Sequence, residues 1–84
     1  MYVMYVLRNS KGGVYLGSTS NLKNRLIQHL TGQVRSTKRD KSWKLCYFEA
    51  YAAKSDALKR EIQLKRFAKS FAVLKKRIAA SLET

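Results

Sequence analysis

The chain has 84 residues, of which 45% are hydrophobic, and it contains four glycines, one cysteine and no proline. A chain of this length supports one hydrophobic core, and this composition is typical of ordered globular proteins, so we expect a single domain over residues 1–84. Eighteen Lys and Arg residues against five Asp and Glu residues give a net charge of +13. That balance favours a polyanionic partner, with nucleic acid first.

Membrane insertion and secretion are both disfavoured by the sequence. No apolar run approaches the ~18 residues of a membrane-spanning helix, and the apolar segment at the start is interrupted by Arg8 without the features of a signal peptide. Cys46 has no partner for an intramolecular disulfide, which fits a reducing compartment. We therefore expect a cytoplasmic protein that does not enter a membrane.

The first part of the chain predicts a hairpin followed by a helix. Residues 2–8 and 14–18 are rich in Val, Tyr and Leu, and the glycines between them suit a hairpin loop. Asn21 ends a run of N-capping residues, after which leucines recur at helical spacing until Gly32. A first helix is therefore predicted over about residues 21–31.

The second part predicts one more strand and two more helices. Residues 33–42 are basic without an apolar period, as expected of a solvated loop or a phosphate-facing surface. Residues 43–51 are β-prone and can complete a three-stranded sheet. The pair Ser55-Asp56 can cap a helix over roughly 56–68, and residues 70–82 can form a third. The predicted class is α+β, with a three-stranded antiparallel sheet flanked by helices.

Arg25 and His29 are the polar residues of interest on the first helix. Their spacing of four places them on one helical face, from which both can point toward the sheet. Taken singly, each also fits the solvated edge of an amphipathic helix.

Glu61 is the one acid in the interior of the second predicted helix. At about 100° per residue it lies among Ala57, Leu64 and Ala68, with Leu58 and Ile62 on its other side. A carboxylate in an apolar stripe must be hydrogen-bonded, paired or metal-bound. The alternative is an ordinary surface pair of Glu61 with Lys65 at i,i+4.

Tyrosines are common in strands for packing reasons, and Tyr5 and Tyr15 stand out only by their context. A phenol ionises poorly at neutral pH, but a neighbouring Arg, Lys or metal charge would lower its pKa and make it a usable base.

The basic residues predict a general phosphate-binding surface whose members the sequence does not rank. The candidates are Lys23, Arg35, Lys38, Arg39, Lys41 and Lys44, with Lys59, Arg60, Lys65 and Arg66 on the second helix and Lys75, Lys76 and Arg77 beyond it.

Five separated elements, in order and spacing, resemble the GIY-YIG nuclease superfamily. They are Val3-Met4-Tyr5, Tyr15-Leu16-Gly17, the run Asn21-Leu22-Lys23-x-Arg25-Leu26, His29, and Glu61 in a late helix. The similarity is greatest to small bacterial members, to the N-terminal nuclease module of excinuclease-type relatives and to Holliday-junction-processing relatives. Ser18 stands where excinuclease-type relatives often carry lysine.

The resemblance implies hydrolysis of a DNA phosphodiester with one divalent ion, Mg²⁺ or Mn²⁺. Tyr15 would act as general base with Tyr5 assisting or positioning it, and Arg25 would bind the scissile phosphate. His29 would support proton transfer or substrate contact, and Glu61 would ligate the metal.

Three functions are therefore open. The first is a metal-dependent DNA endonuclease in repair or recombination, with branched or damaged DNA among its candidate substrates. The second is a nucleic-acid-binding module with the same fold and little or no catalysis. The third and weakest is a protein-interaction adaptor. DNA-versus-RNA preference and oligomeric state are open in all three.

Overall fold

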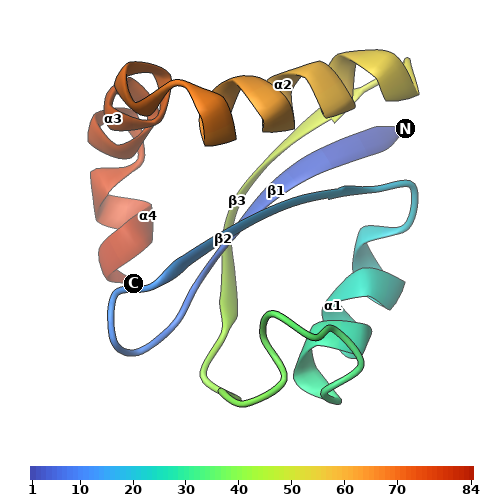
Figure 1. Ribbon diagram of the computed structural model, residues 1–84, viewed down its shortest axis with the longest axis vertical. Helices are drawn as coiled ribbons and strands as arrows, with labels where there is room; N and C mark the ends of the chain where they lie inside the picture. Colours follow the sequence, from blue (N-terminus) through green and yellow to red (C-terminus); the bar gives the residue numbers. More distant parts are fainter.

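The computed structural model describes residues 1–84 as a three-stranded sheet with helices on both faces (Figure 1). The elements are β1 (Tyr2–Arg8), β2 (Val14–Thr19), α1 (Leu22–Leu30), β3 (Lys44–Tyr51), α2 (Lys54–Arg66), α3 (Ala68–Arg77) and α4 (Ala79–Glu83). The predicted α+β class and sheet are confirmed. None of the helices is long and apolar enough to cross a membrane.

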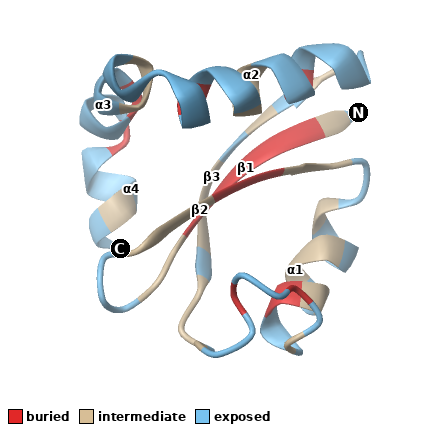
Figure 2. Cartoon of the chain, viewed as in Figure 1, coloured by how far each residue is buried: buried red, intermediate tan, exposed pale blue.

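The sheet has the order β2-β1-β3, and both strand pairs are antiparallel. The β1–β2 hairpin turns at Gly12, whose φ of 82° lies in the left-handed region that glycine adopts readily. The side chain of Asn9 supports this turn by accepting hydrogen bonds from the backbone N–H groups of Lys11 and Gly13. The central strand β1 is buried along most of its length (Figure 2).

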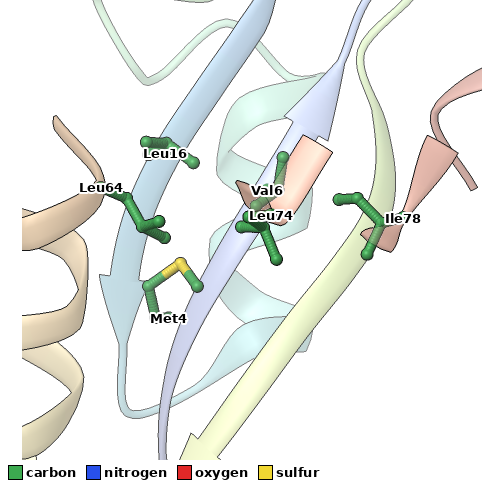
Figure 3. Packing of buried hydrophobic residues seen from close by; sticks show 6 residues of the cluster. All are labelled: Met4, Val6, Leu16, Leu64, Leu74 and Ile78. Atoms are coloured by element: carbon green, nitrogen blue, oxygen red, sulfur yellow. The ribbon is translucent and has the colours of Figure 1, made fainter. Parts of the chain in front are cut away.

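Side chains of β1 alternate between two hydrophobic cores, one on each face of the sheet. Met4 and Val6 pack with Leu16 of β2 under α2 and α3 (Figure 3). The other members of this core are Leu64, Leu74 and Ile78. On the opposite face the core consists of Val3, Tyr5 and Leu7, covered by Tyr15, Leu22, Leu26, Trp43 and Leu45. The helix α1 therefore shares its core with Tyr5.

The helix α1 forms within one residue of each predicted end. Asn21 is its N-cap, because its side-chain Oδ1 accepts a hydrogen bond from the N–H of Asn24 at 3.0 Å. Gly32 follows with a φ of 77°, a conformation that ends helices and that glycine adopts without a Cβ clash.

The later helices differ from the prediction in their ends. The helix α2 begins two residues early, at Lys54, without a side-chain cap, and ends at Arg66 because Phe67 is extended. The predicted helix over 70–82 begins early and is interrupted at Ile78, which separates α3 from α4. Ile78 is only 5% exposed and belongs to the core, so the break allows one buried side chain to pack while the chain changes direction.

A polar cluster ties β3 to α2 on the face away from α1. The carboxylate of Glu49 accepts hydrogen bonds from Tyr47, Tyr51 and Arg60, with the Arg60 Nε–Oε1 distance at 2.9 Å. Burial tends to raise the pKa of Glu49, but these three donors outweigh it and hold the pKa below its ordinary value. Burial and the bond to Glu49 raise the pKa of Tyr51 to about 12. Arg60 is therefore a structural cation rather than a free phosphate ligand.

Candidate active site

Gly17 of β2 gives Tyr5 the room to lie across the sheet. The two residues are direct partners in the β1–β2 register, so they share a face. A Cβ at Gly17 would lie 2.5 Å from the Tyr5 hydroxyl oxygen and 2.6 Å from Cζ, which is far inside van der Waals contact. The absence of a side chain at Gly17 therefore directs the phenol of Tyr5 over β2 toward α1.

Tyr5, Arg25 and His29 form a continuous hydrogen-bonded chain. The Tyr5 hydroxyl lies 2.8 Å from His29 Nε2 and accepts a bond from Arg25 Nε at 3.4 Å. The i,i+4 spacing on α1 thus places both side chains on the sheet-facing side, as the sequence analysis allowed. Arg25 is further held by a 3.0 Å bond from Nη1 to Gln28 Oε1. These contacts order a guanidinium beside a buried phenol.

Burial sets the protonation of this chain. Removal of Tyr5 from water raises its pKa, and the opposing hydrogen bond from Arg25 is too weak to reverse that shift. The neighbouring Arg25 therefore does not lower the pKa of Tyr5 below its ordinary value, because desolvation dominates. Burial, followed by the charge of Arg25, lowers the pKa of His29. Both groups are neutral at pH 7.

Thr37 fixes the tautomer of His29, and the sequence analysis did not identify it. Its Oγ1 lies 2.8 Å from His29 Nδ1, and its hydroxyl donates to the carbonyl of Val34 at 3.4 Å. Since that hydroxyl proton is used, Nδ1–H must donate to Thr37, which leaves Nε2 to accept from Tyr5. Val34 and Thr37 are buried although the surrounding loop is basic and exposed. In the sequence, only Val34, the one apolar residue in residues 33–42, indicated that part of this loop packs against the core.

Tyr15 is the partly exposed tyrosine of the site. Its ring centroid lies 4.9 Å from that of His29 and 6.3 Å from that of Tyr5, so the two motif tyrosines flank the imidazole. Trp43 packs against its other side in an edge-on arrangement, with centroids 6.4 Å apart. Tyr15 is thus supported by aromatic rings and keeps contact with solvent.

Glu61 approaches the same strand from the other face of the sheet. Ser18 pairs with Met4, whose side chain packs against Leu64 of α2, so Ser18 points toward α2. The Ser18 hydroxyl donates to Glu61 Oε1, and Lys65 Nζ lies 2.6 Å from Oε2. The Glu61 side chain is only 17% exposed. Both interpretations of Glu61 are therefore realised in part: it is half-buried, and it pairs with Lys65.

The apolar residues beside Glu61 divide between core and solvent. Ala57 and Leu64 are buried, whereas Leu58 is 37% exposed and Ile62 is 51% exposed. The buried stripe of α2 is thus narrower than the sequence indicated, and Glu61 lies at its border. Since Gly17 and Ser18 are consecutive, the contacts of Tyr5 and of Glu61 meet at neighbouring residues of β2.

The predicted phosphate-binding cations are all on the surface. Those of α1, the following loop and the start of β3 are exposed, namely Lys23, Arg35, Lys38, Arg39, Lys41 and Lys44. Lys65 is also exposed, but its ammonium is engaged by Glu61. The cations of α1 and of the following loop therefore lie on the side of the sheet that carries α1, whereas the candidates on α2 and α3 lie on the opposite side.

Comparison with known proteins agrees with this arrangement. The family model described as the GIY-YIG catalytic domain matches residues 1–77, and the chain belongs to this family. A UPF0213 protein of Staphylococcus saprophyticus is 33% identical over 69 residues, covering 81% of this chain and 84% of the relative. A UPF0213 protein of Staphylococcus aureus is 34% identical over 67 residues, covering 79% and 82%.

A solved structure is also similar. The solution NMR structure of a UPF0213 protein from Bacillus halodurans aligns over 100% of this chain and 95% of its own length, with a TM-score of 0.56 and 25% identity. The resemblance inferred from the motif residues is therefore confirmed at the level of family and fold.

Proposed function

We propose that this protein is a divalent-metal-dependent endonuclease that hydrolyses DNA phosphodiester bonds. The observation that carries the proposal is the ordered chain Arg25–Tyr5–His29 beside the partly exposed Tyr15. A nuclease fold with a charge of +13 accounts for the substrate class, because Lys and Arg neutralise backbone phosphates. Branched or damaged DNA in repair or recombination is the proposed context, in the cytoplasm.

Tyr15 is the proposed general base and Tyr5 is a positioning residue. Tyr15 combines access to solvent with the neighbouring imidazole of His29, so it can take a proton from an attacking water. Tyr5 is fully buried and retains its proton, which it donates to His29 Nε2. Its role is to hold His29 and Arg25 in place rather than to exchange protons with substrate.

Arg25 is the proposed ligand of the scissile phosphate. Its Nε donates to the Tyr5 hydroxyl and its Nη1 to Gln28 Oε1, and these two bonds fix the guanidinium plane. A fixed guanidinium can stabilise the negative charge that develops on a phosphate in the transition state. His29, held by Thr37 and Tyr5, supports proton transfer or contacts the substrate.

Glu61 is the proposed metal ligand, and Mg²⁺ or Mn²⁺ is the proposed ion. No group of three or more His, Cys, Asp or Glu side chains is present to enclose an ion. A single half-buried carboxylate with a neighbouring hydroxyl, Ser18, fits an ion that keeps most of its waters and also takes a phosphate oxygen. When bound, such an ion supplies charge stabilisation to the phosphate and lowers the pKa of water.

The pairing of Glu61 with Lys65 favours a second candidate function, a binding module without turnover. An ammonium at 2.6 Å already neutralises the carboxylate, so an ion must displace it. Lys65 is half-exposed at its side chain and can move into solvent, which keeps the endonuclease as the first proposal.

The test compares wild type with Glu61→Gln and Tyr15→Phe on nicked, branched and plasmid DNA, with Mg²⁺ or Mn²⁺ and with EDTA. We expect cleavage by wild type that EDTA abolishes and that each substitution reduces by about 10²-fold or more. Glu83→Gln is the matched control, since Glu83 is an exposed acid on α4, far along the chain from the site. If wild type binds DNA but cleaves it no faster than Glu61→Gln and Tyr15→Phe do, the binding module is supported instead.

A further inference from the structure

A pocket of about 340 Å³ lies directly behind His29, and the proposed hydrolysis does not use it. Its walls come from three parts of the fold: Leu7 of β1, Leu26, His29 and Leu30 of α1, and Trp43 with Leu45 around the start of β3. Five of its seven lining residues are hydrophobic. The volume is near the lower end of small-ligand pockets, ~300–1,000 Å³, so it has room for one flat ring system.

His29 and Trp43 separate this pocket from Tyr15. Both rings line the pocket, and both pack against the Tyr15 ring, at centroid distances of 4.9 and 6.4 Å. An occupant would therefore lie one ring away from the proposed general base. If the backbone of a nucleic acid binds at Tyr15, a neighbouring part of the same strand can reach this pocket.

Positive charge lies beside the pocket. Lys44 is exposed and is one of the lining residues, and the loop that joins α1 to β3, the two elements that form its walls, carries the exposed Arg35, Lys38, Arg39 and Lys41. An apolar and aromatic interior with Lys44 in its wall and a basic loop next to it is complementary to a nucleotide, whose base is flat and apolar on its faces and whose phosphate is anionic.

Trp43 adds a polar feature. Its indole Nε1 is the one buried side-chain nitrogen or oxygen without a hydrogen-bond partner. An unpaired buried donor is costly, and the edges of nucleobases carry the carbonyl and ring-nitrogen acceptors that this N–H lacks.

We propose that this pocket receives one unpaired base of a DNA substrate, extruded from the helix next to the phosphate that is cut. The proposal rests on the proposed nuclease function and specifies its substrate, which would be DNA with a bulged, mismatched or single-stranded nucleotide. Such bases cost less to extrude than paired ones, which makes the pocket a source of selectivity.

The test measures binding in EDTA at fixed salt, with a fully paired duplex and with the same duplex carrying one bulged 2-aminopurine. We expect wild type to bind the bulged duplex about 5- to 150-fold more tightly, the range expected for one stacked base. We also expect the 2-aminopurine emission to fall on binding, because the base would stack against Trp43 and His29.

Leu30→Trp fills the mouth of the pocket, and Ile27→Trp is its matched control. The two residues lie on α1 with nearly equal exposure, 49% and 48%, but only Leu30 lines the pocket. Leu30→Trp should remove the preference for the bulge and the fluorescence change while leaving affinity for paired DNA unchanged, and Ile27→Trp should keep both.

Three results would overturn the inference. If wild type bound both duplexes with equal affinity, the pocket proposal would be rejected. It would also be rejected if Leu30→Trp kept both the preference for the bulged duplex and the fall in 2-aminopurine emission seen with wild type. Either result would leave the nuclease proposal intact. Failure to bind either duplex would reject the nucleic-acid function, and the pocket proposal with it. Cleavage plays no part in these measurements, so an absent activity would count only against the nuclease proposal.

Discussion

The phenol of Tyr5 occupies the space in which any other residue at position 17 would carry its Cβ. Gly17 is not required by its backbone angles, since its φ is not positive. A glycine is required at position 17 because the ring of Tyr5 crosses over it. The motif tyrosine of β1 and the motif glycine of β2 are therefore one structural unit, although eleven residues lie between them in the chain.

Gly17→Ala should destabilise the protein and misplace the site. The new methyl group must move the Tyr5 ring, at a cost of about 1–3 kcal/mol in the free energy of unfolding, as for overpacked cores. Urea denaturation measures this loss. Gly13→Ala is the control, because its methyl group would meet only the end of the Asn9 side chain and should cost less. Equal losses would contradict the role assigned to Gly17.

Tyr5→Phe and Tyr15→Phe should differ in their kinetic signatures. Loss of the Tyr15 hydroxyl removes the proposed base, so kcat should fall by about 10²- to 10⁴-fold. Loss of the Tyr5 hydroxyl frees Arg25 and His29 but leaves the base present. The decrease in kcat should therefore be smaller, and the variant should keep partial activity at every pH tested. Single-turnover cleavage as a function of pH separates the two, and the reverse order would exchange their roles.

Thr37→Val should impair the site through His29. The variant keeps the shape of the side chain but removes the acceptor of Nδ1–H, which leaves a buried donor unpaired at a cost of about 1–3 kcal/mol. We expect that loss of stability together with about 10-fold slower cleavage, by analogy with other groups that orient a histidine. Thr37→Ser, which restores the hydroxyl, should recover both quantities, and a serine variant as damaged as valine would argue for packing alone.

The pH dependence of stability should contain a step caused by His29. Burial lowers the pKa of His29 in the folded state, so between that pKa and about 6.5 the unfolded chain binds more protons. The free energy of unfolding should therefore fall as the pH drops below about 6.5, by at most about 1.4 kcal/mol per pH unit for one group. His29→Gln should flatten this region. The lowered pKa of Glu49 acts at more acidic pH and leaves a separate decline in both proteins.

Glu49 and Arg60 should show strong coupling. Glu49→Gln removes the charge that three donors share, and Arg60→Gln leaves a half-buried carboxylate with two phenols only. We expect each single variant to cost about 1–3 kcal/mol and the pair to be clearly non-additive in a double-mutant cycle. Glu83→Gln, at an exposed acid, should stay within about 0.5 kcal/mol of wild type.

The sequence predicted the elements that depend on short-range patterns. Asn21 and Gly32 bound α1 as expected, and the i,i+4 spacing placed Arg25 and His29 together. Thr37 was not predictable, because its partner lies eight residues away through a turn with no regular period. Ile78 interrupts its helix for a tertiary reason, which local propensity does not contain.

Glu61 illustrates a different limit. Spacing gave two alternatives, a stripe residue and a Lys65 pair, and the structure contains both because Glu61 lies at the border of the buried stripe of α2. Ser18, which the sequence marked only as a departure from the excinuclease pattern, is the group that connects Glu61 to β2. A long-range hydrogen bond of this kind has no signature in one sequence.

The position of β1 between the other strands has a consequence for local opening. Residues 3–7 of β1 form the longest consecutive buried run, and they supply both cores. The α1 layer can therefore detach while the α2 layer still protects the sheet, but β1 itself can open only when the whole domain does. In native-state hydrogen exchange, the amides of β1 should report the global free energy of unfolding, and those of α1 should exchange earlier. The strand that presents Tyr5 to the site is thus also the last part of the molecule to be exposed.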